Sequence, residues 1–258
     1  MVRGLTVTIV AKNEEERIQA CLESVAWAPE IVVVDAESTD RTAEIARKFT
    51  PKVIVRPWAG FAAQKNFALT QATEPWILSL DADEQVPPEL REEIRGILEA
   101  DGPLDGYSVP RKNVFLGRWI RHGTWFPDYQ LRLFRRGAGV FRAVSVHESV
   151  EVTSGRLGHL RTPLLHVSYR DIADFVQRSN RYSTLAAQDL ARAGTRVSWW
   201  ELLLRPVGRF CSMYVLHRGF LDGREGFVLA LLYSYYVFLR TAKAWALGRA
   251  ERRPPDPA

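Results

Sequence analysis

The sequence is poor in cysteine, in lysine and in long apolar stretches. Only Cys21 and Cys211 occur among its 258 residues, which excludes a disulfide scaffold and a zinc site made of four cysteines. The pair gives no reason to expect an oxidising compartment. A chain of this length buries about 70–75% of its unfolded surface, so its core needs no covalent or metal support.

No apolar stretch is long enough to cross a membrane as a helix. The longest run without a charge is Gly226–Leu239, fourteen residues that end at Arg240, whereas a spanning helix needs about 20. The first residues also lack a signal-peptide pattern, because Lys12 and Glu14 follow the short apolar run Leu5–Val10. We therefore expect a cytoplasmic protein, attached peripherally to the inner face of the cell membrane.

Lysine is scarce, with 6 residues against 29 arginines, and the charge is unevenly distributed. Residues 1–150 carry 19 basic and 21 acidic side chains, while residues 151–258 carry 16 basic and 9 acidic. Arginine binds phosphate through two parallel hydrogen bonds, so the basic half indicates phosphate-bearing partners: nucleic acid, a sugar nucleotide or anionic lipid. A GC-rich coding sequence would also replace lysine by arginine, and this is an alternative explanation for part of the excess of arginine over lysine.

The first hundred residues alternate short apolar runs with helical patterns. Continuous apolar strands separated by helices are typical of a parallel sheet covered on both faces. The predicted fold class is therefore α/β, with a mostly parallel, Rossmann-like sheet. Asn13 is expected to cap the first helix. The expected strands are 5–10, 31–34, 53–55 and 76–80, and the expected helices are 13–25, 42–49, 61–70 and 88–99.

The pattern changes after residue 105. Strand-like runs follow at 106–110, 130–134, 145–152 and 164–167, and the chain reads as helical from Asp171 onward. These changes predict an α/β domain over residues 1–170 with halves at 1–105 and 106–170, a helical extension over 171–250, and a disordered tail over 251–258.

Two carboxylates follow the fourth expected strand directly. Asp81 and Asp83 are two residues apart, so in extended chain both point to one side, at the strand end where open α/β sheets bind ligands. Two carboxylates there suit a divalent cation held against a diphosphate. Asp35 ends its own strand and Glu14 follows the first strand, so further acidic groups meet at this edge. A turn followed by a helix cap is the alternative interpretation.

Four segments resemble, in order and spacing, the successive motifs of family 2 glycosyltransferases, which have the GT-A fold. They are Thr8–Glu15, Val33–Asp40 with Thr42, Ala62–Asn66 and Leu80–Glu84, and the resemblance covers about residues 4–170. Pro127–Phe134, Val146–Glu148 and Gly219–Gly223 resemble the branch that contains lipopolysaccharide core glycosyltransferases of the WaaE/KdtX type. The resemblance implies a GT-A-like catalytic domain with a nucleotide-sugar half over 1–105 and an acceptor half over 106–170.

The resemblance also assigns roles in binding a nucleoside diphosphate sugar. Asp35 would bind the base of the nucleotide and Asp81 its ribose, while Asp83 would hold a divalent cation, Mg²⁺ or Mn²⁺, on the diphosphate. His166 could also reach the cation, although a lone histidine is more often a satisfied core residue. The remaining binding residues would be Ala11 through its backbone, Glu14, Lys65 and Asn66.

Asp128 is the expected general base. Transfer with inversion needs a carboxylate that takes the proton of the acceptor hydroxyl as it attacks the anomeric carbon. Trp125 and Tyr129 would stack on sugar rings, and His147 and Glu148 would belong to the acceptor site. Each assignment has an alternative. Asp128 could be a strand-edge aspartate capped by neighbouring amides, and the aromatic side chains could belong to the core. His147 and Glu148 could lie on an ordinary surface strand.

The carboxyl-terminal helical region mixes aromatic residues with arginines. Such helices are typical of segments that lie among lipid headgroups, so we expect residues 198–249 to bind an anionic membrane surface. A helical pair packed on the catalytic domain, or a dimer interface, is the alternative, and the oligomeric state stays open. Nucleic acid is not an expected partner, because no RNA-binding or helix-turn-helix pattern accompanies the charge.

These features together predict an inverting, metal-dependent glycosyltransferase. It would move a hexosyl or heptosyl group from a nucleoside diphosphate sugar to a lipid-linked or envelope glycan, as in lipopolysaccharide core assembly. A polyprenyl-phosphate glycosyltransferase, or a catalytically silent glycan-binding or membrane scaffold, is the alternative. A nucleotidyltransferase is disfavoured, because the first strand is followed by no glycine-rich phosphate loop.

Overall fold

A computed structural model describes residues 4–142, 149–195 and 197–250 of the chain, which divides into two compact units. Unit 1 comprises residues 1–113 and 127–167, and unit 2 comprises residues 114–126 and 168–258. This division differs from the expected single boundary near residue 170, because residues 114–126 group with the helices that follow unit 1.

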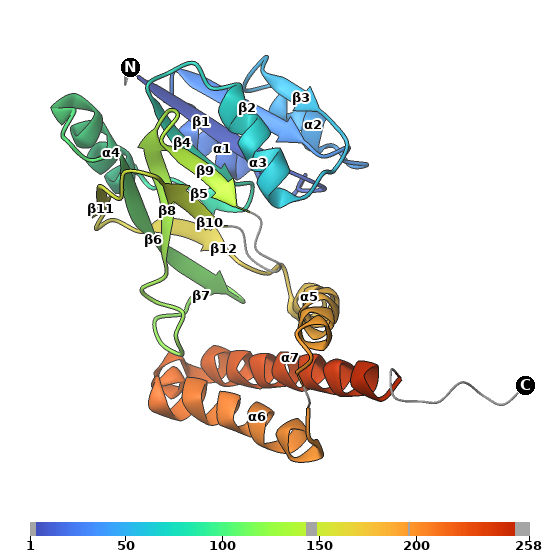
Figure 1. The fold of residues 1–258 in the computed structure, drawn as a ribbon. Helices are drawn as coiled ribbons and strands as arrows, with labels where there is room; N and C mark the ends of the chain where they lie inside the picture. Colours follow the sequence, from blue (N-terminus) through green and yellow to red (C-terminus); the bar gives the residue numbers. More distant parts are fainter. Residues whose placement is uncertain (1–3, 143–148, 196, 251–258) are drawn as a thin grey trace, which may run out of the picture. The chain divides into compact units, whose positions relative to one another are not determined.

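A mixed sheet forms the centre of unit 1 (Figure 1). The first four strands in spatial order are parallel, and the next two are antiparallel to their neighbours. The register pairs Ala11 with Asp35 and Val10 with Asp81, so these strand ends lie side by side at one edge. The order is β3 (Val53–Val55), β2 (Glu30–Asp35), β1 (Leu5–Ala11), β4 (Trp76–Asp81), β8 (Tyr129–Arg135) and β6 (Gly106–Phe115).

Shorter strands extend this sheet beyond β6. Strand β12 (Leu164–Val167) follows β6 in the sheet and carries β5 (Glu84–Gln85) antiparallel to it. Strand β11 (Leu157–His159) runs parallel to β6, and β9 (Gly139–Arg142) and β10 (Ser149–Val152) form a separate hairpin. The pairing of β5 with β12 brings the chain just after Asp83 next to His166.

Apolar side chains alternate between the two faces of the sheet, and helices cover both. The core on one face holds Val7 and Val33 with α1 (Ile18–Val25), α2 (Thr42–Ala46) and α4 (Pro88–Ala100). On the other face Val32 and Val34 pack on α3 (Phe61–Thr70). Burial of alternate residues on opposite faces gives the continuous apolar runs seen in the sequence. The predicted α/β class with a mostly parallel sheet is confirmed.

The first helix begins later than expected. Asn13 has a backbone φ of 56°, which a helix does not allow, and its side-chain Oδ1 accepts a hydrogen bond from the Thr39 N–H at 2.9 Å. The helix starts only at Ile18. Asn13 therefore ties together two loops at the sheet edge instead of capping α1.

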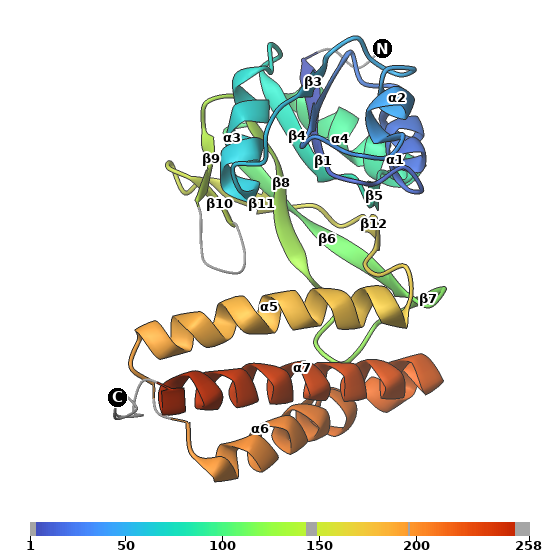
Figure 2. The same ribbon diagram turned by 90° about the vertical axis from the view of Figure 1, so that its right-hand side faces the viewer.

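Unit 2 is built from three long helices and the segment 114–126. Helix α7 (Gly223–Ala250) packs on both α5 (Ile172–Arg192) and α6 (Trp199–Cys211) and lies between them (Figure 2). A core cluster joins Phe115, Ile120 and Trp125 to side chains of these helices, which explains why 114–126 belong to this unit. The short strand β7 (Arg118–Trp119) pairs with the end of β6. None of the helices in the described ranges has the length and hydropathy that a bilayer crossing requires.

Gly226 lies where α7 passes the preceding turn, and we expect Gly226→Ala to destabilise unit 2. A Cβ at this position would lie 2.1 Å from the carbonyl oxygen of Gly219. The backbone must shift to make room for this Cβ, and overpacking of this kind lowers the free energy of unfolding by about 1–3 kcal/mol. Gly208→Ala in α6 is the matched control, because its Cβ meets nothing within 4 Å. Thermal unfolding that gives both variants equal melting temperatures would contradict the expectation.

Candidate active site

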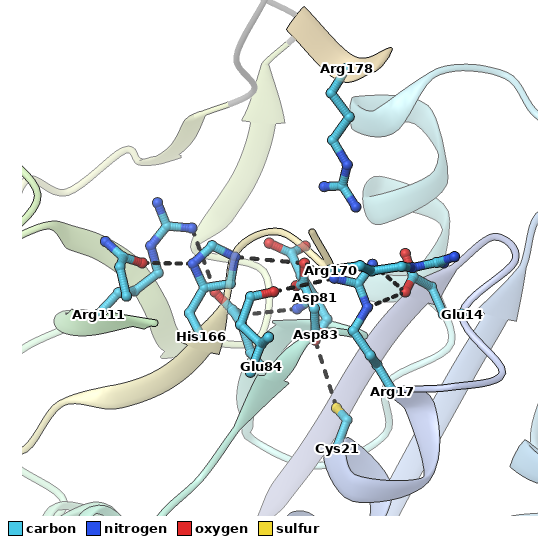
Figure 3. Close-up of polar contacts among 12 residues, drawn as sticks. Glu14, Arg17, Cys21, Asp81, Asp83, Glu84, Arg111, His166, Arg170 and Arg178 are labelled. Atoms are coloured by element: carbon cyan, nitrogen blue, oxygen red, sulfur yellow. Dashed lines mark hydrogen bonds and ion pairs between the residues drawn. The ribbon is translucent and has the colours of Figure 1, made fainter. Parts of the chain in front are cut away.

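The predicted carboxylates of the parallel strands gather at one edge of unit 1. Asp35 ends β2, Asp81 ends β4, and Asp83 lies in the turn that leads into β5. Figure 3 shows Asp81, Asp83 and Glu84 among the side chains of Arg17, Arg111 and His166. All of these residues belong to unit 1.

Asp81 is held between two cations. Its Oδ1 lies 2.7 Å from Lys65 Nζ, and its Oδ2 lies 2.5 Å from Arg132 Nη2. The same Arg132 atom is 2.6 Å from Oε1 of Glu84, which is fully buried. Burial raises the pKa of Asp81, but Arg132 and Lys65 outweigh it and hold that pKa well below its usual value. Asp81 is therefore ionised and fixed in place.

Asp83 faces a histidine and an arginine. Its Oδ2 lies 3.6 Å from His166 Nε2 and 3.5 Å from Arg17 Nη1. His166 Nδ1 lies 2.6 Å from Asn113 Oδ1, an oxygen that can only accept, so Nδ1 donates and Nε2 is the atom that faces Asp83. Burial raises the pKa of Asp83, and the interaction with His166 more than offsets this and lowers it.

A carboxylate and an imidazole that face each other are suitable donors for a divalent cation. Mg²⁺ takes oxygen ligands, typically one or two carboxylates together with substrate phosphates and water, and the softer Mn²⁺ also accepts an imidazole nitrogen. Within the described part of the chain no three histidine, cysteine or acidic side chains converge on one point. The residues therefore fit a cation that Asp83 and His166 hold jointly with a diphosphate.

Asp128 precedes β8 and is held by a guanidinium group and two amides. Arg111 donates to Oδ2 from Nε at 2.8 Å and from Nη2 at 2.6 Å, and Asn113 Nδ2 donates to the same oxygen at 3.2 Å. Gln130 Nε2 donates to Oδ1 at 2.8 Å. Burial raises the pKa of Asp128, but the charge of Arg111 and the amide hydrogen bonds bring it below its usual value. Asp128 is thus a carboxylate at neutral pH.

The residues predicted to hold the nucleotide have partners within the chain. Asp35 is 1% exposed and accepts from the backbone N–H and the hydroxyl of Ser38 at 3.0 and 2.5 Å. Glu14 pairs with Arg17 at 2.6 Å. The carbonyl of Ala11 accepts from the Ala36 N–H at 2.9 Å. The nucleotide-binding roles of Asp35, Glu14 and Ala11 stay predictions.

Asn66 and Trp125 both have partners within the protein. The Asn66 amide donates to the carbonyl of Phe141 at 2.8 Å and accepts from its N–H at 2.9 Å, so it joins α3 to β9, and its role in donor binding stays a prediction. Trp125 is only 8% exposed and packs against the rings of Phe115 and Tyr233 in the core of unit 2. The ring therefore belongs to the core of unit 2, and its role in acceptor stacking stays a prediction.

Of the three other residues predicted for the acceptor site, the structure describes only Tyr129. Tyr129 is 45% exposed, and its ring makes an edge contact with His159 at a centroid distance of 4.9 Å. It stays a candidate for sugar stacking. His147 and Glu148 lie outside the described residues.

Four residues that were not predicted also belong to the site: Glu84, Arg111, Asn113 and Arg132. The sequence contains one indication for Arg132. Asp128, Gln130 and Arg132 are each two residues apart, and residues two apart in a strand share a face, so Arg132 could have been expected on the same face as Asp128. Their partners lie far away in the sequence, such as Asp81 for Arg132. Spacing alone does not reveal such pairs.

The chain is similar to known proteins over nearly its whole length. Residues 6–150 match the family model described as Glycosyl transferase family 2. The chain is 33% identical over 257 residues to the lipopolysaccharide core biosynthesis glycosyltransferase LpsC of Rhizobium meliloti, which covers 97% of this chain and 95% of that protein. It is 30% identical over 262 residues to an uncharacterized glycosyltransferase of Rickettsia typhi, covering 97% and 90% of the two chains.

Two solved structures align with most of this chain. S. aureus TarS 1-349 in complex with UDP-GlcNAc is 16% identical, with a TM-score of 0.49 over 96% of this chain and 91% of that one. The mannosyltransferase PcManGT from Pyrobaculum calidifontis, in complex with GDP-Man and Mn²⁺, is 17% identical, with a TM-score of 0.49 over 98% and 76% of the chains.

Proposed function

The chain belongs to glycosyl transferase family 2, and from this premise we propose that it moves a hexosyl or heptosyl group, with inversion, from a nucleoside diphosphate sugar to a lipid-linked or envelope glycan. One observation carries the proposal. A series of polar contacts runs from Asp83 to Asp128. Asp83 Oδ2 lies 3.6 Å from His166 Nε2, and His166 Nδ1 lies 2.6 Å from Asn113 Oδ1. Asn113 Nδ2 then donates to Asp128 Oδ2 at 3.2 Å. This series of polar contacts connects the group proposed to bind the diphosphate with the proposed proton acceptor, which supports assigning both to one site.

In this proposal the donor binds at the edge of the sheet. Asp83 and His166 hold the cation, which neutralises charge on the departing diphosphate when it is bound. Asp81 has 32% of its side chain exposed, against 5% for Lys65 and 6% for Arg132. Its carboxylate is therefore the part of this cluster that can meet a ribose hydroxyl, while the two cations fix its orientation.

Asp128 then acts as the general base. Its carboxylate takes the proton of the acceptor hydroxyl while the hydroxyl oxygen bonds to the anomeric carbon, and the bond from that carbon to the diphosphate oxygen breaks. The bonding electrons leave with the nucleoside diphosphate. Arg111 and Asn113 keep the carboxylate oriented and ionised before the proton arrives.

Two observations support a lipid-linked or envelope glycan as the acceptor. The relative from Rhizobium meliloti is named for lipopolysaccharide core biosynthesis, and it aligns with 97% of this chain. The arginine-rich second half suits an acceptor that carries phosphate. A polyprenyl phosphate is the competing acceptor and would receive the sugar on a phosphate oxygen.

A panel of sugar nucleotides tests the proposal. Thermal shift with and without Mn²⁺ should single out one donor whose stabilisation depends on the metal. Product analysis with that donor should then give a glycosidic bond to a glycan hydroxyl. Transfer to polyprenyl phosphate would establish the alternative acceptor, and donor binding without transfer or donor hydrolysis would identify a silent scaffold.

Arg111→Met is expected to move the acidic limb of the pH–kcat profile toward neutral pH. The variant keeps the burial that raises the pKa of Asp128 and removes the charge that lowers it. A base works when deprotonated, so activity falls as pH drops through its pKa, and a higher pKa moves that fall to higher pH. In the native protein the fall should lie below the usual range of an aspartate, because the pKa of Asp128 is lowered. Arg95→Met, at an exposed site on α4, should leave the profile unchanged; an unshifted profile in Arg111→Met would contradict the pairing.

A further inference from the structure

The side of α6 that faces solvent is apolar, whereas the solvent-facing side of an ordinary surface helix is polar. A helix on a globular protein normally buries its apolar stripe and exposes its charges. In α6 no residue is buried, and its most exposed large side chains are all apolar. We call this surface the α6 apolar face; it consists of Trp199 (54% exposed), Trp200 (55%), Leu203 (55%), Leu204 (65%) and Val207 (59%).

The apolar surface continues past the end of α6. Leu216, the last residue of the short π-helix Ser212–Leu216 that follows α6, is 75% exposed. Phe220 and Phe227 are 48% and 42% exposed, and both rings contact that of Tyr214, at centroid distances of 6.2 and 5.4 Å. The exposed residues thus extend from α6 through the turn to the start of α7. A continuous apolar surface of this kind marks a binding surface rather than scattered exposed residues.

The charges of this region are predominantly positive. Residues 198–250 contain seven lysines and arginines and three acidic residues. Glu201 and Glu225 pair with Arg205 and Arg118, and Asp222 is 2% exposed. Each acidic side chain is therefore compensated or buried, which leaves a surface that attracts anions.

We propose that the α6 apolar face binds the headgroup region of an anionic lipid bilayer, with α6 lying in the plane of the membrane. Tryptophan prefers this region, and Trp199 and Trp200 stack on each other at 3.7 Å at the first turn of α6. Leucines enter the acyl boundary while arginines meet lipid phosphates. This inference goes beyond the proposed function and does not depend on it, because lipid binding requires neither donor nor acceptor.

A second copy of the chain is a less suitable occupant. A symmetric dimer would place the same surface of two molecules face to face. The net positive charge of residues 198–250 would then be present on both sides of the interface, and like charges across an interface oppose association. An anionic bilayer meets the same charges with attraction.

The test measures binding of the full chain to vesicles of phosphatidylcholine, alone or mixed with phosphatidylglycerol. Native protein should bind the mixed vesicles, more weakly at high salt. Leu204→Glu places a charge on the α6 apolar face and should weaken binding about tenfold or more. Leu185→Glu, at a 39% exposed site on α5, is the matched control and should bind like the native protein.

Three outcomes would overturn the proposal. They are absence of binding to mixed vesicles, equal binding to both kinds of vesicle, and a dimer that Leu204→Glu dissociates without any lipid binding. Circular dichroism and the melting temperature show whether Leu204→Glu is folded. Trp200→Ser, also at an exposed site, is a second variant that should lose binding in the same way.

Discussion

Asp83→Ala is expected to abolish metal-dependent binding of the sugar nucleotide while leaving the fold intact. Asp83 supplies a carboxylate that faces His166 Nε2. Without it His166 remains as a single protein donor, which holds a hard cation poorly. The affinity for the donor in Mn²⁺ should fall by about 100-fold or more. Loss of a group that only supports a metal ligand already costs about 10–100-fold in metal affinity, and Asp83 is proposed to be a ligand itself. Arg17 keeps its pair with Glu14, so no charge is left isolated.

Calorimetric titration of the donor, with and without Mn²⁺, measures this effect without relying on turnover. Glu92→Ala removes a carboxylate from the exposed side of α4 and is the control that should behave as the native protein does. The melting temperature of Asp83→Ala should stay close to that of the control. If the variant still bound the donor more tightly in Mn²⁺ than without it, the cation would have to be held elsewhere.

Asp128→Asn should lower kcat by about 10²–10⁴-fold, the range that general-base assistance contributes. Asparagine keeps the shape of the side chain and can still accept from Arg111, but it cannot take a proton. Donor affinity should be nearly unchanged, since the role of Asp128 is confined to the transition state. That contrast separates Asp128 from Asp83, whose loss acts on donor binding.

A second aspartate in unit 1 offers a close control. Asp105 accepts from Arg156 at 3.0 and 2.7 Å, nearly the geometry of Asp128 with Arg111, but it lies at the opposite end of β6. Asp105→Asn therefore measures the cost of removing the negative charge from such a pair away from the site. Near-normal turnover in Asp128→Asn would assign the base to another residue, with Glu148 the next to test.

The sequence was informative wherever the signal was local. Apolar runs located the strands, and the predicted helix 61–70 has the observed bounds. Asp81 and Asp83 could be placed at the sheet edge because a strand end follows directly from the run before it. These features depend on neighbours within a few residues.

Roles that depend on distant partners were not predictable in the same way. Asn66 meets the backbone of Phe141, and Trp125 meets Tyr233, only after the chain has folded. The same holds for Arg132, which neutralises Asp81 from a strand more than forty residues away. A polar or aromatic residue near a motif thus gives no indication of whether it faces a ligand or another part of the protein.

The path of segment 114–126 has a consequence for the order in which the protein folds as it is synthesised. The chain passes between the two units three times, after residues 113, 126 and 167. Phe115, Ile120 and Trp125 are made early, but the side chains that bury them, such as Leu229, emerge more than a hundred positions later. A nascent chain that has completed unit 1 therefore still carries three unprotected apolar side chains. A chain shortened after Val167 would keep this state permanently, so we expect it to aggregate rather than yield an independent catalytic fragment.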